Sequence, residues 1–297
     1  MAMDRTSKSP DKIFSMKHEN LCGTRLREHL HCRPIIPFIG IYDVFSASLA
    51  AKHFDALFVS GFSFAASHYG LPDHGFIAWP DIVNFVQRIR SIVPHHHLLV
   101  DIDDGYCDIE VACHVARSLD QLGASGIVLE DQARPRRCGH EEDKRILPLN
   151  EYLTKLDAVL AWRGDLFVVA RTDATEADEI KHRVVAFREA GCDAVLADGV
   201  QSLDLLTEIR ALVDCPVVFN QMAGGKSPAC SLTELQSHCA GMVIYSTPCL
   251  FAAQTAVERT LQALRAEDGS LGSAMTRDAT LKTCNEVLLQ NLNQRRT

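Results

Sequence analysis

Apolar residues along this chain fall into short continuous runs that alternate with amphipathic stretches. Four segments share one pattern, in which a helix-like end and a small polar turn precede an apolar run and a polar stop: 51–61, 121–131, 188–198 and 237–246. Four more apolar runs match the strand portion alone: 37–43, 97–103, 166–173 and 215–221. Continuous apolar runs without alternation are typical of strands buried on both faces, so the pattern predicts a parallel sheet.

Amphipathic stretches between these runs predict helices. Apolar residues recur at three- and four-residue spacing in three of them: 81–92, 108–122 and 149–162. Asp81 and Asn150 stand where N-caps are expected, and Asp108 where a first-turn charge would complement the helix dipole. Eight strand–helix units without a long linker predict a closed (β/α)₈ barrel. The alternative, an open doubly wound sheet, lacks a G-x-G-x-x-G motif after its first strand.

The barrel pattern suggests a simple division of the chain. Residues 1–34 are predicted to form a polar tail and a helix, and residues 35–297 a single (β/α)₈ barrel domain with C-terminal helices. After the eighth strand, 250–267 and 274–296 have helical patterns. These helices exceed what a barrel needs, so we expect them to cap the barrel or to reach a neighbouring subunit.

Composition narrows the classes of function. The 297 residues are 47% hydrophobic and 23% charged, with a net charge of −8, which is typical of a globular chain and not of a disordered one. The acidic balance argues against a nucleic-acid surface and favours a small-molecule substrate. Residues 1–20 lack an apolar signal segment, and no apolar run is long enough to span a bilayer. We therefore expect neither a nucleic-acid nor a membrane partner.

The 11 cysteines indicate a reducing compartment. Their number is odd and no C-x-x-C pair occurs, which argues against a disulfide framework and against a zinc ribbon. We expect a cytoplasmic protein in which most of these thiols are buried as small apolar side chains.

Polar residues stand at the predicted strand ends, where barrel enzymes place their chemistry. Carboxylates are crowded there, among them Asp101, Asp103 and Glu130. A single aspartate at such a position is more often a helix N-cap. However, alternation along a strand would point Asp101 and Asp103 to one face, and Glu130 comes from the next strand. Crowded carboxylates need a cation, and oxygen ligands favour Mg²⁺, with Mn²⁺ as an alternative.

The segment 130–146, EDQARPRRCGHEEDKRI, is the most distinctive stretch of the chain. Arginines and a lysine surround Cys138, and His140 follows two residues on. Neighbouring cations stabilise a thiolate, so we expect a lowered pKa at Cys138. A charged, glycine-containing loop also suits a lid over an anionic substrate. The alternative is a solvated loop with an incidental cysteine.

Several motifs then occur in one order over most of the chain: IYDVFSASLA (41–50), SGFSFAASHYGLPDHG (60–75), VDIDDGY (100–106), LEDQ (129–132), RRCGH (136–140), ARTDA (170–174) and FNQMAGGKSP (219–228). Together they resemble the isocitrate lyase/phosphoenolpyruvate mutase superfamily. The R-C-G-H element is similar to the catalytic loop of its methylisocitrate lyase, dimethylmalate lyase and carboxyphosphonoenolpyruvate phosphonomutase branch. Phosphoenolpyruvate mutases and oxaloacetate decarboxylases generally lack that cysteine.

The resemblance implies a barrel whose last helix is exchanged between paired subunits, usually in a dimer of dimers. It implies Mg²⁺ held near Asp101, Asp103 and Glu130, largely through waters. The implied catalytic set is Cys138 as acid/base on a gating loop, together with Arg171, His140 and Arg136. The implied substrate-binding residues are Tyr42, Asp43, Ser60, Gly61, Phe62, Asp198 and Asn220.

These parts fit a retro-aldol cleavage of a 2-hydroxy di- or tricarboxylate to a 2-oxo acid and a carboxylate, with Cys138 protonating the carbanion. Two alternatives stay open: a phosphonomutase or other phosphorus–carbon enzyme, and a barrel that binds carboxylates without turnover. Departures from the family pattern leave the substrate open. They are Phe62 for a small residue, Arg136 for a frequent lysine, Asp198 for a usual glutamate, and atypical residues at Asp104, Cys107 and Gln221.

Overall fold

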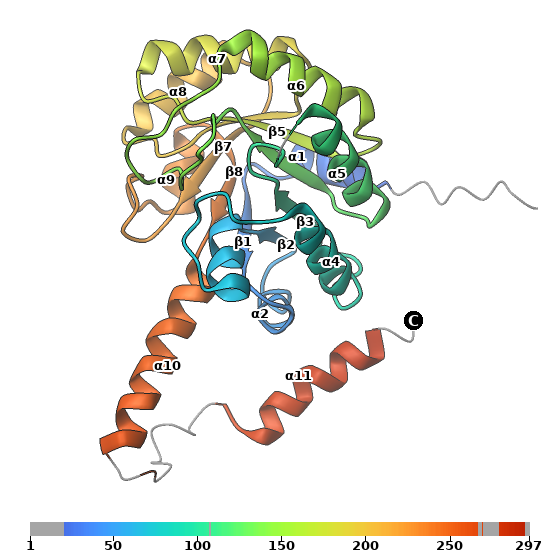
Figure 1. Cartoon of the computed structure of the whole chain (residues 1–297), viewed down its shortest axis with the longest axis vertical. Helices are drawn as coiled ribbons and strands as arrows, with labels where there is room; N and C mark the ends of the chain where they lie inside the picture. Colours follow the sequence, from blue (N-terminus) through green and yellow to red (C-terminus); the bar gives the residue numbers. More distant parts are fainter. Residues whose placement is uncertain (1–20, 107, 267–268, 270–278, 295–297) are drawn as a thin grey trace, which may run out of the picture.

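The computed structural model describes residues 21–106, 108–266, 269 and 279–294 of the chain. Its centre is a closed barrel of eight parallel strands paired in chain order, with the last strand returning to the first (Figure 1). The strands are β1 (Ile36–Ile41), β2 (Ala56–Val59), β3 (His97–Asp101), β4 (Gly126–Glu130), β5 (Phe167–Thr172), β6 (Ala194–Ala197), β7 (Val217–Gln221) and β8 (Ala240–Tyr245). The predicted (β/α)₈ barrel is confirmed.

Helices form the outer layer of the molecule (Figure 1). They are α1 (Cys22–Cys32), α2 (Val44–Ala50), α3 (Gly61–Phe64), α4 (Trp79–Arg90), α5 (Ile109–Gln121), α6 (Leu149–Trp162), α7 (Ala177–Glu189), α8 (Leu203–Leu212), α9 (Leu232–Ser237), α10 (Pro248–Ala266) and α11 (Leu281–Gln294). A short π-helical turn, Ala65–Tyr69, continues α3. Because all eight strands run parallel, the loops that follow them lie at one end of the barrel.

Two apolar layers hold the barrel together. Side chains inside it, such as Phe38 and Phe58, form one buried cluster that includes Leu26 of α1. Helix α1 therefore closes the N-terminal end of the barrel. Its close approach depends on Gly23, because an added Cβ would lie 1.8 Å from the carbonyl oxygen of Asp165. The second cluster fills the space between the strands and the outer helices.

Two helix starts differ from the predicted caps. Asp81 and Asn150 lie in the first turns of α4 and α6, whose N-caps are Ala78 and Pro148. Asp108 is itself the N-cap of α5, where it accepts a hydrogen bond from the Val111 N–H, and not a first-turn charge. These predictions were wrong because a polar side chain near a helix start is favourable at either position.

The C-terminal helices extend away from the barrel (Figure 1). None of the α10 side chains is buried, and Val257 and Leu261 are 57% and 61% exposed. Helix α11 contacts α2, where Asn291 Nδ2 donates to Ser48 Oγ at 2.8 Å. The helices predicted at 250–267 and 274–296 are present within the described ranges; residues 267, 274–278 and 295–296 lie outside them. Exchange of a helix between subunits stays a prediction.

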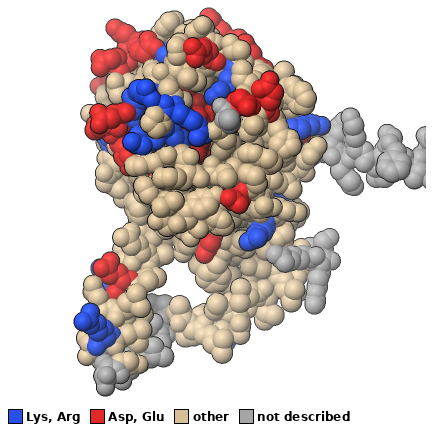
Figure 2. Space-filling model, viewed as in Figure 1, with Lys and Arg blue, Asp and Glu red and all other residues tan. Residues whose placement is uncertain are grey.

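The surface and the cysteines complete this description. Figure 2 shows basic and acidic side chains next to each other over the barrel, whereas the protruding α10 carries few charges on this face. Among the described residues, no helix is long and apolar enough to cross a membrane. The ten described cysteines are free, but only five of them are buried. The expectation that most thiols are buried is therefore only half met.

Candidate active site

Acidic side chains converge at the C-terminal mouth of the barrel. Asp101 and Glu130 are the last residues of β3 and β4, and Asp103 follows β3 in a left-handed conformation with φ of 52°. All three are buried. An added Cβ on Gly61 would lie 3.1 Å from both Asp101 Oδ2 and Asp103 Oδ1, so these two oxygens approach one point. The expected cluster is present, but a turn and not strand alternation brings Asp103 into it.

Arg136 is a buried cation among these carboxylates, with 1% of its surface exposed. Its Nε donates to Glu130 Oε1 at 2.8 Å. Its Nη1 lies 3.4 Å from Asp103 Oδ1 and also donates to Asp73 Oδ1. A planar guanidinium can contact three carboxylates at once, so Arg136 ties the loop after β4 to the segment that follows β2.

Arg171 is a second buried cation and belongs to β5. Its Nε and Nη2 donate to the two oxygens of Asp173 at 2.9 and 3.0 Å. Its Nη1 lies 3.3 Å from Glu130 Oε2, and its Nη2 lies 2.8 Å from Asp198 Oδ2. Lys144 contacts the other side of Asp173 at 2.7 Å. Although burial alone would raise it, Arg171 and Lys144 hold the pKa of Asp173 well below its usual value.

Burial controls the ionisation of the remaining carboxylates. It raises the pKa of Asp101 and raises that of Asp103 well above its usual value, against the opposing charge of Arg136. It raises the pKa of Glu130 to about 7, although Arg136 and Arg171 act in the other direction. Neither carboxylate oxygen of Asp103 has a hydrogen-bond donor in the described part of the chain. The C-terminal end of the barrel therefore contains more buried carboxylates than Arg136 and Arg171 can neutralise.

This donor set fits a hydrated divalent cation. The described residues contain no tight group of three His, Cys, Asp or Glu side chains that could cage an ion directly. Mg²⁺ usually keeps several waters and takes only one or two protein carboxylates, so a tight cage is not needed. The two oxygens of Asp103 without donors, beside Asp101 and Glu130, are the kind of group that such an ion and its waters satisfy.

Cys138 lies beside the cluster, on the loop that joins β4 to α6, and its side chain is buried. Burial, together with the negative charges of Asp73 and Asp198, raises the pKa of its thiol to about 12, against the charge of Arg171. The expected lowering of this pKa is therefore wrong. The thiol stays protonated at neutral pH.

Acidic side chains from other loops hold the cations of the Cys138 loop, so these cations do not offset the effect of burial on the thiol. Arg134 donates to both oxygens of Asp104, at 2.7 and 2.8 Å. Arg136 is engaged by three carboxylates, as described above. Lys144 Nζ donates to the carbonyl oxygen of Gly139 as well as to Asp173. The loop is thus folded and held on several sides, and it is not the solvated loop of the alternative interpretation.

A chain of buried hydrogen bonds crosses the mouth. Ser246 Oγ donates to Asn220 Oδ1 at 2.6 Å, and Asn220 Nδ2 donates to Asp198 Oδ1 at 2.8 Å. Asp198 Oδ2 then pairs with Arg171. Gly139 packs directly against this chain, because an added Cβ would lie 1.8 Å from Asp198 Oδ2. The glycine of the R-C-G-H element is therefore required by space.

His140 is held from the loop after β7. Its Nδ1 accepts the backbone N–H of Lys226 at 3.0 Å, and its Nε2 lies 3.3 Å from Asn220 Nδ2. Burial lowers the pKa of His140, although Asp198 acts against this, so the ring is neutral at neutral pH. The side chain of Lys226 donates to the carbonyl oxygen of Glu141 at 2.9 Å. Lys226 thus fastens the Cys138 loop through two successive residues.

Comparison of the chain with known protein families agrees with the barrel fold. Residues 26–265 match the phosphoenolpyruvate phosphomutase family. The chain belongs to this family. It is therefore an enzyme of the isocitrate lyase/phosphoenolpyruvate mutase superfamily, in agreement with the resemblance found in its motifs.

Individual relatives in this superfamily catalyse different reactions. The chain is 33% identical over 258 residues to a 2-methylisocitrate lyase of Bacillus subtilis, covering 85% of this chain and 84% of the relative. It is 30% identical over 274 residues to the chloroplastic carboxyvinyl-carboxyphosphonate phosphorylmutase of Arabidopsis thaliana, covering 89% and 80%. A solved oxaloacetate acetylhydrolase, bound to 3,3-difluorooxalacetate, has a TM-score of 0.86 at 27% identity, covering 93% and 96%.

Two of the substrate-binding residues that the superfamily resemblance implies act as helix caps. The Asp43 carboxylate caps α2 by accepting the Ser46 N–H at 2.6 Å. Ser60 caps α3 by accepting the Ser63 N–H at 3.2 Å. Both still stand at the barrel mouth, because each follows a strand. Ser60 keeps its hydroxyl proton for a further acceptor.

Phe62 and Tyr42 lie on the side of the mouth from which α10 leaves. The Phe62 ring packs edge-to-face on Phe251 of α10, with ring centroids 6.1 Å apart. Tyr42 is half-buried, and burial raises the pKa of its hydroxyl, with Asp43 and Cys249 contributing. The described contacts of Phe62 and Tyr42 do not include the carboxylate cluster, unlike those of Gly61, which abuts Asp101 and Asp103.

Sequence reasoning missed several residues that complete the site. Asp173 and Ser246 stand at strand ends, so their position alone could have selected them. Asp73 lies inside the motif 60–75, but nothing in the pattern indicates its ion pair with Arg136. Lys226 belongs to the G-G-K run, which lacks the spacing of a phosphate-binding loop. Its role depends on contacts between two loops.

Proposed function

We propose that this enzyme is a Mg²⁺-dependent carbon–carbon lyase that cleaves a 2-hydroxy di- or tricarboxylate to a 2-oxo acid and a carboxylate. The observation that carries this proposal is a buried thiol, Cys138, kept protonated beside a carboxylate cluster in which Asp103 accepts no hydrogen bond from the described residues. Such a thiol can supply the proton that a carbanion fragment needs. The likeness to the 2-methylisocitrate lyase supports the same reaction class.

Asp101, Asp103 and Glu130 would hold the metal ion, partly through water, with Mn²⁺ as a substitute for Mg²⁺. When bound, the ion would orient the oxygens of a 2-hydroxycarboxylate and lower the pKa of its hydroxyl. The substrate would contact Gly61, Asp198 and Asn220 beside the cluster. Tyr42, Asp43, Ser60 and Phe62 would form the adjoining wall.

The enzyme's own groups would then complete the reaction. Arg171 and Arg136 provide fixed positive charge for the negative charge that develops on the departing fragment. As the carbon–carbon bond breaks, the substrate hydroxyl loses its proton and becomes the carbonyl of the 2-oxo acid, and Cys138 Sγ–H donates its proton to the carbanion carbon of the departing fragment. The proton released from the hydroxyl restores the thiol. The folded Cys138 loop keeps bulk water away from the carbanion. Neutral His140, whose Nδ1 accepts from the loop after β7, keeps its ring proton on Nε2, which faces the carboxylate of Asp198.

The test is a turnover assay with a matched variant. Purified enzyme with Mg²⁺ and a panel of isocitrates and alkylmalates should release a 2-oxo acid, measured by coupled reduction. In heavy water the carboxylate product should carry one deuterium at the cleaved carbon. Cys138→Ser should lower kcat by about 10²-fold or more while substrate binding, measured by calorimetry, persists. Cys113→Ser, at a buried thiol on α5, should keep full activity.

Two outcomes would count against the proposal in different ways. Full activity of Cys138→Ser would remove the acid role of the thiol. No 2-oxo acid from any substrate of the panel would remove the lyase reaction itself.

A second candidate function is a different reaction at the same active site. Similarity to the Arabidopsis phosphorylmutase supports a phosphorus–carbon reaction, and similarity to the oxaloacetate acetylhydrolase supports hydrolysis of an oxo acid. A ³¹P NMR screen with phosphonopyruvate distinguishes the first reaction. Acetate release from oxaloacetate distinguishes the second. Carboxylate binding without turnover is not supported, because the family is one of enzymes.

We also propose a cytoplasmic homo-oligomer, assembled as a dimer of dimers. Helix α10 has no buried side chain, and the exposed leucines on α11, such as Leu288 and Leu289, form apolar surface that the described residues of one chain do not cover. Packing of these helices on a neighbouring subunit would cover that surface. Sedimentation of the full chain tests the assembly. The free thiols of the described residues fit a reducing compartment.

A further inference from the structure

Two thiols lie together at the end of the barrel opposite the active site. Cys192 comes just before β6 and Cys215 just before β7, and these strands are neighbours in the barrel. The side chains of Cys192 and Cys215 interact through a hydrogen bond, which raises the pKa of the Cys192 thiol and lowers that of Cys215. Both cysteines are free and buried. A hydrogen bond between thiols places the two sulfur atoms close together, which is the first requirement for a disulfide.

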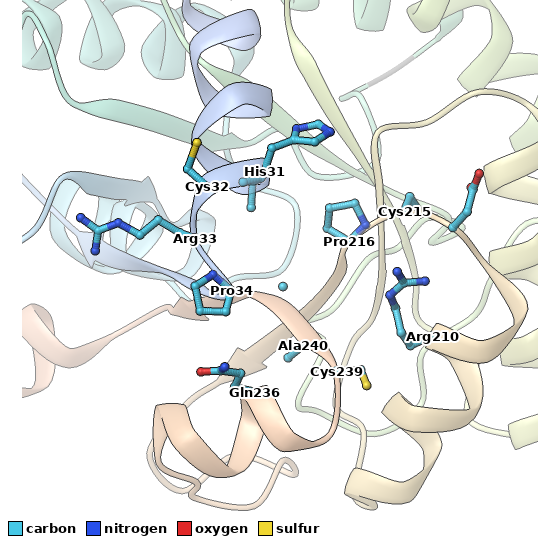
Figure 3. Close-up of a pocket in the computed structure, with 13 residues that line it drawn as sticks. His31, Cys32, Arg33, Pro34, Arg210, Cys215, Pro216, Gln236, Cys239 and Ala240 are labelled. Atoms are coloured by element: carbon cyan, nitrogen blue, oxygen red, sulfur yellow. The ribbon is translucent and has the colours of Figure 1, made fainter.

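Cys215 is the member of the pair that small molecules can approach. It lines a cavity of about 590 Å³ and a second one of about 290 Å³. In the first cavity, Cys215 and Arg210 lie on one side, and His31 and Pro34 lie on the other (Figure 3). Cys192 lines neither cavity, so Cys215 is the residue of the pair that an oxidant in the cavity would reach first.

The surroundings favour Cys215 as the attacking sulfur. Arg188 Nη1 donates to the carbonyl oxygen of Cys192 at 3.0 Å, and its Nε pairs with Asp214. The hydrogen bond with Cys192 lowers the pKa of the Cys215 thiol, and the charge of Arg188 adds to this, while burial and Asp214 oppose it. A thiol that ionises more easily and borders a cavity reacts with peroxides before a fully enclosed one.

We propose that Cys192 and Cys215 form a redox-active dithiol, which a hydroperoxide entering the cavity oxidises to a disulfide. The Cys215 thiolate attacks a peroxide oxygen and breaks the O–O bond, which gives a sulfenic acid and a hydroxide that takes up the released thiol proton. The Cys192 sulfur then attacks the Cys215 sulfur and displaces hydroxide, which leaves as water with the Cys192 proton. Two electrons pass from the thiols to hydrogen peroxide, which becomes two waters.

The disulfide would span the shortest strand pairing of the barrel. Strands β6 and β7 pair through only two residue pairs, Val195 with Val217 and Leu196 with Val218, whereas every other neighbouring pair has at least three. A covalent link at the start of these strands would prevent their separation. It also restricts the unfolded chain, so the oxidised enzyme should melt at a higher temperature. This inference does not depend on the proposed reaction.

The experiment uses the full-length wild-type enzyme treated with hydrogen peroxide, then alkylated, digested and mapped by mass spectrometry. We expect one peptide pair linked through Cys192 and Cys215, which a reductant separates into two free thiols. Differential scanning calorimetry should show a higher melting temperature that returns to the original value after reduction. Cys113→Ala, the matched control, should form the same link.

Variants then test the order of attack. Cys192→Ala should leave a sulfenic acid on Cys215, which dimedone traps, and circular dichroism checks that this variant is folded. The proposal fails if both thiols stay reduced at peroxide concentrations that oxidise the exposed Cys32 and Cys239. It also fails if Cys215 links to Cys239 in place of Cys192.

Discussion

The two ends of the barrel handle charge in opposite ways. At the C-terminal mouth, Arg136 and Arg171 are 1% and 5% exposed and lie among buried carboxylates. At the N-terminal end, α1 closes the barrel with apolar side chains, and charged pairs stay near the surface. Arg163, for example, pairs with Asp193 at 2.6 Å with its side chain 24% exposed. Burying paired charges costs stability that apolar packing would not, so the mouth is built for chemistry and the other end for stability.

Removing one arginine from each end gives the largest expected contrast. Arg171→Gln would leave Glu130, Asp173 and Asp198 without their shared cation, so activity should fall about 10³-fold and stability by about 3–5 kcal/mol. Arg163→Gln should leave activity unchanged and cost at most about 1 kcal/mol. Steady-state kinetics and urea unfolding measure both. Equal losses of stability in the two variants would contradict the difference between the ends.

Adding one methyl group at each end gives a smaller contrast. Gly139→Ala would push its Cβ against Asp198 and displace Arg171, so kcat/KM should fall about 10²-fold. Gly191, before β6, has φ of 100° with nothing within 4 Å of an added Cβ. Gly191→Ala should therefore cost about 1 kcal/mol through backbone strain and leave activity intact. Kinetics and thermal unfolding check the pair, and an active Gly139→Ala enzyme would show that the mouth can adapt.

Releasing the Cys138 loop should have a moderate effect. Lys226→Ala removes the side-chain bond to the Glu141 carbonyl, so kcat should fall about 10-fold with little change in stability. Limited proteolysis should show faster cleavage within 131–148, which a purely structural loss elsewhere would not produce. Lys181→Ala, at an exposed lysine that pairs with Glu208, is the control. An unchanged cleavage rate in Lys226→Ala would remove its holding role.

The pH dependence of stability should distinguish the ends by sign. Glu130 has a folded pKa raised to about 7 from 4.5, so its contribution is present at low pH and is lost as the pH rises toward 7. His97, near α1, has a pKa lowered to about 4 from 6.5 by burial, with His29 adding to it, so its contribution is lost as the pH falls below 6.5. Melting temperatures measured across this pH range check both contributions. Glu130→Gln should lose the decrease in stability as the pH rises toward 7, and His97→Gln should lose the decrease as the pH falls below 6.5.

The effect of Mg²⁺ on the melting temperature gives a further test of the two ends. Added Mg²⁺ should raise the melting temperature of the wild-type enzyme, on the order of 5 °C above pH 7, and less at pH 5. A chelator should reverse the rise. Glu130→Gln should show a smaller response, whereas His97→Gln should respond like the wild type. An equal response in Glu130→Gln would remove this carboxylate from the proposed metal site.

The sequence predicts the barrel well because its strands are buried on both faces, which leaves a plain apolar run for each strand. It also places Asp101 and Glu130 correctly, since each ends a strand. It fails where the outcome depends on partners that are distant in the chain. The pKa of Cys138 depends first on the burial of its thiol, which no local pattern indicates. The nearby arginines are paired as well, and the carboxylates that bind Arg134 and Arg136 lie 30 and 63 residues away in the chain.

Local backbone geometry sets a second limit on sequence reasoning. Asp103 reaches the cluster through a left-handed turn, which an Asp can adopt but no apolar pattern indicates. The helix caps show the same limit, because Asp43 and Ser60 each lie between the end of a strand and the first residue of a helix. A residue at such a junction can serve the fold, the substrate or both, and its sequence position is the same in every case.

The short pairing between β6 and β7 has a consequence for how the molecule would aggregate. A closed barrel has no edge strand, because each strand pairs with a neighbour on both sides. If this pairing opens first on heating, β6 and β7 become two edges at once, each with a row of unpaired backbone groups and apolar side chains. Their runs, AVLA and VVFN, would then be free to pair with the same edges of a second opened barrel.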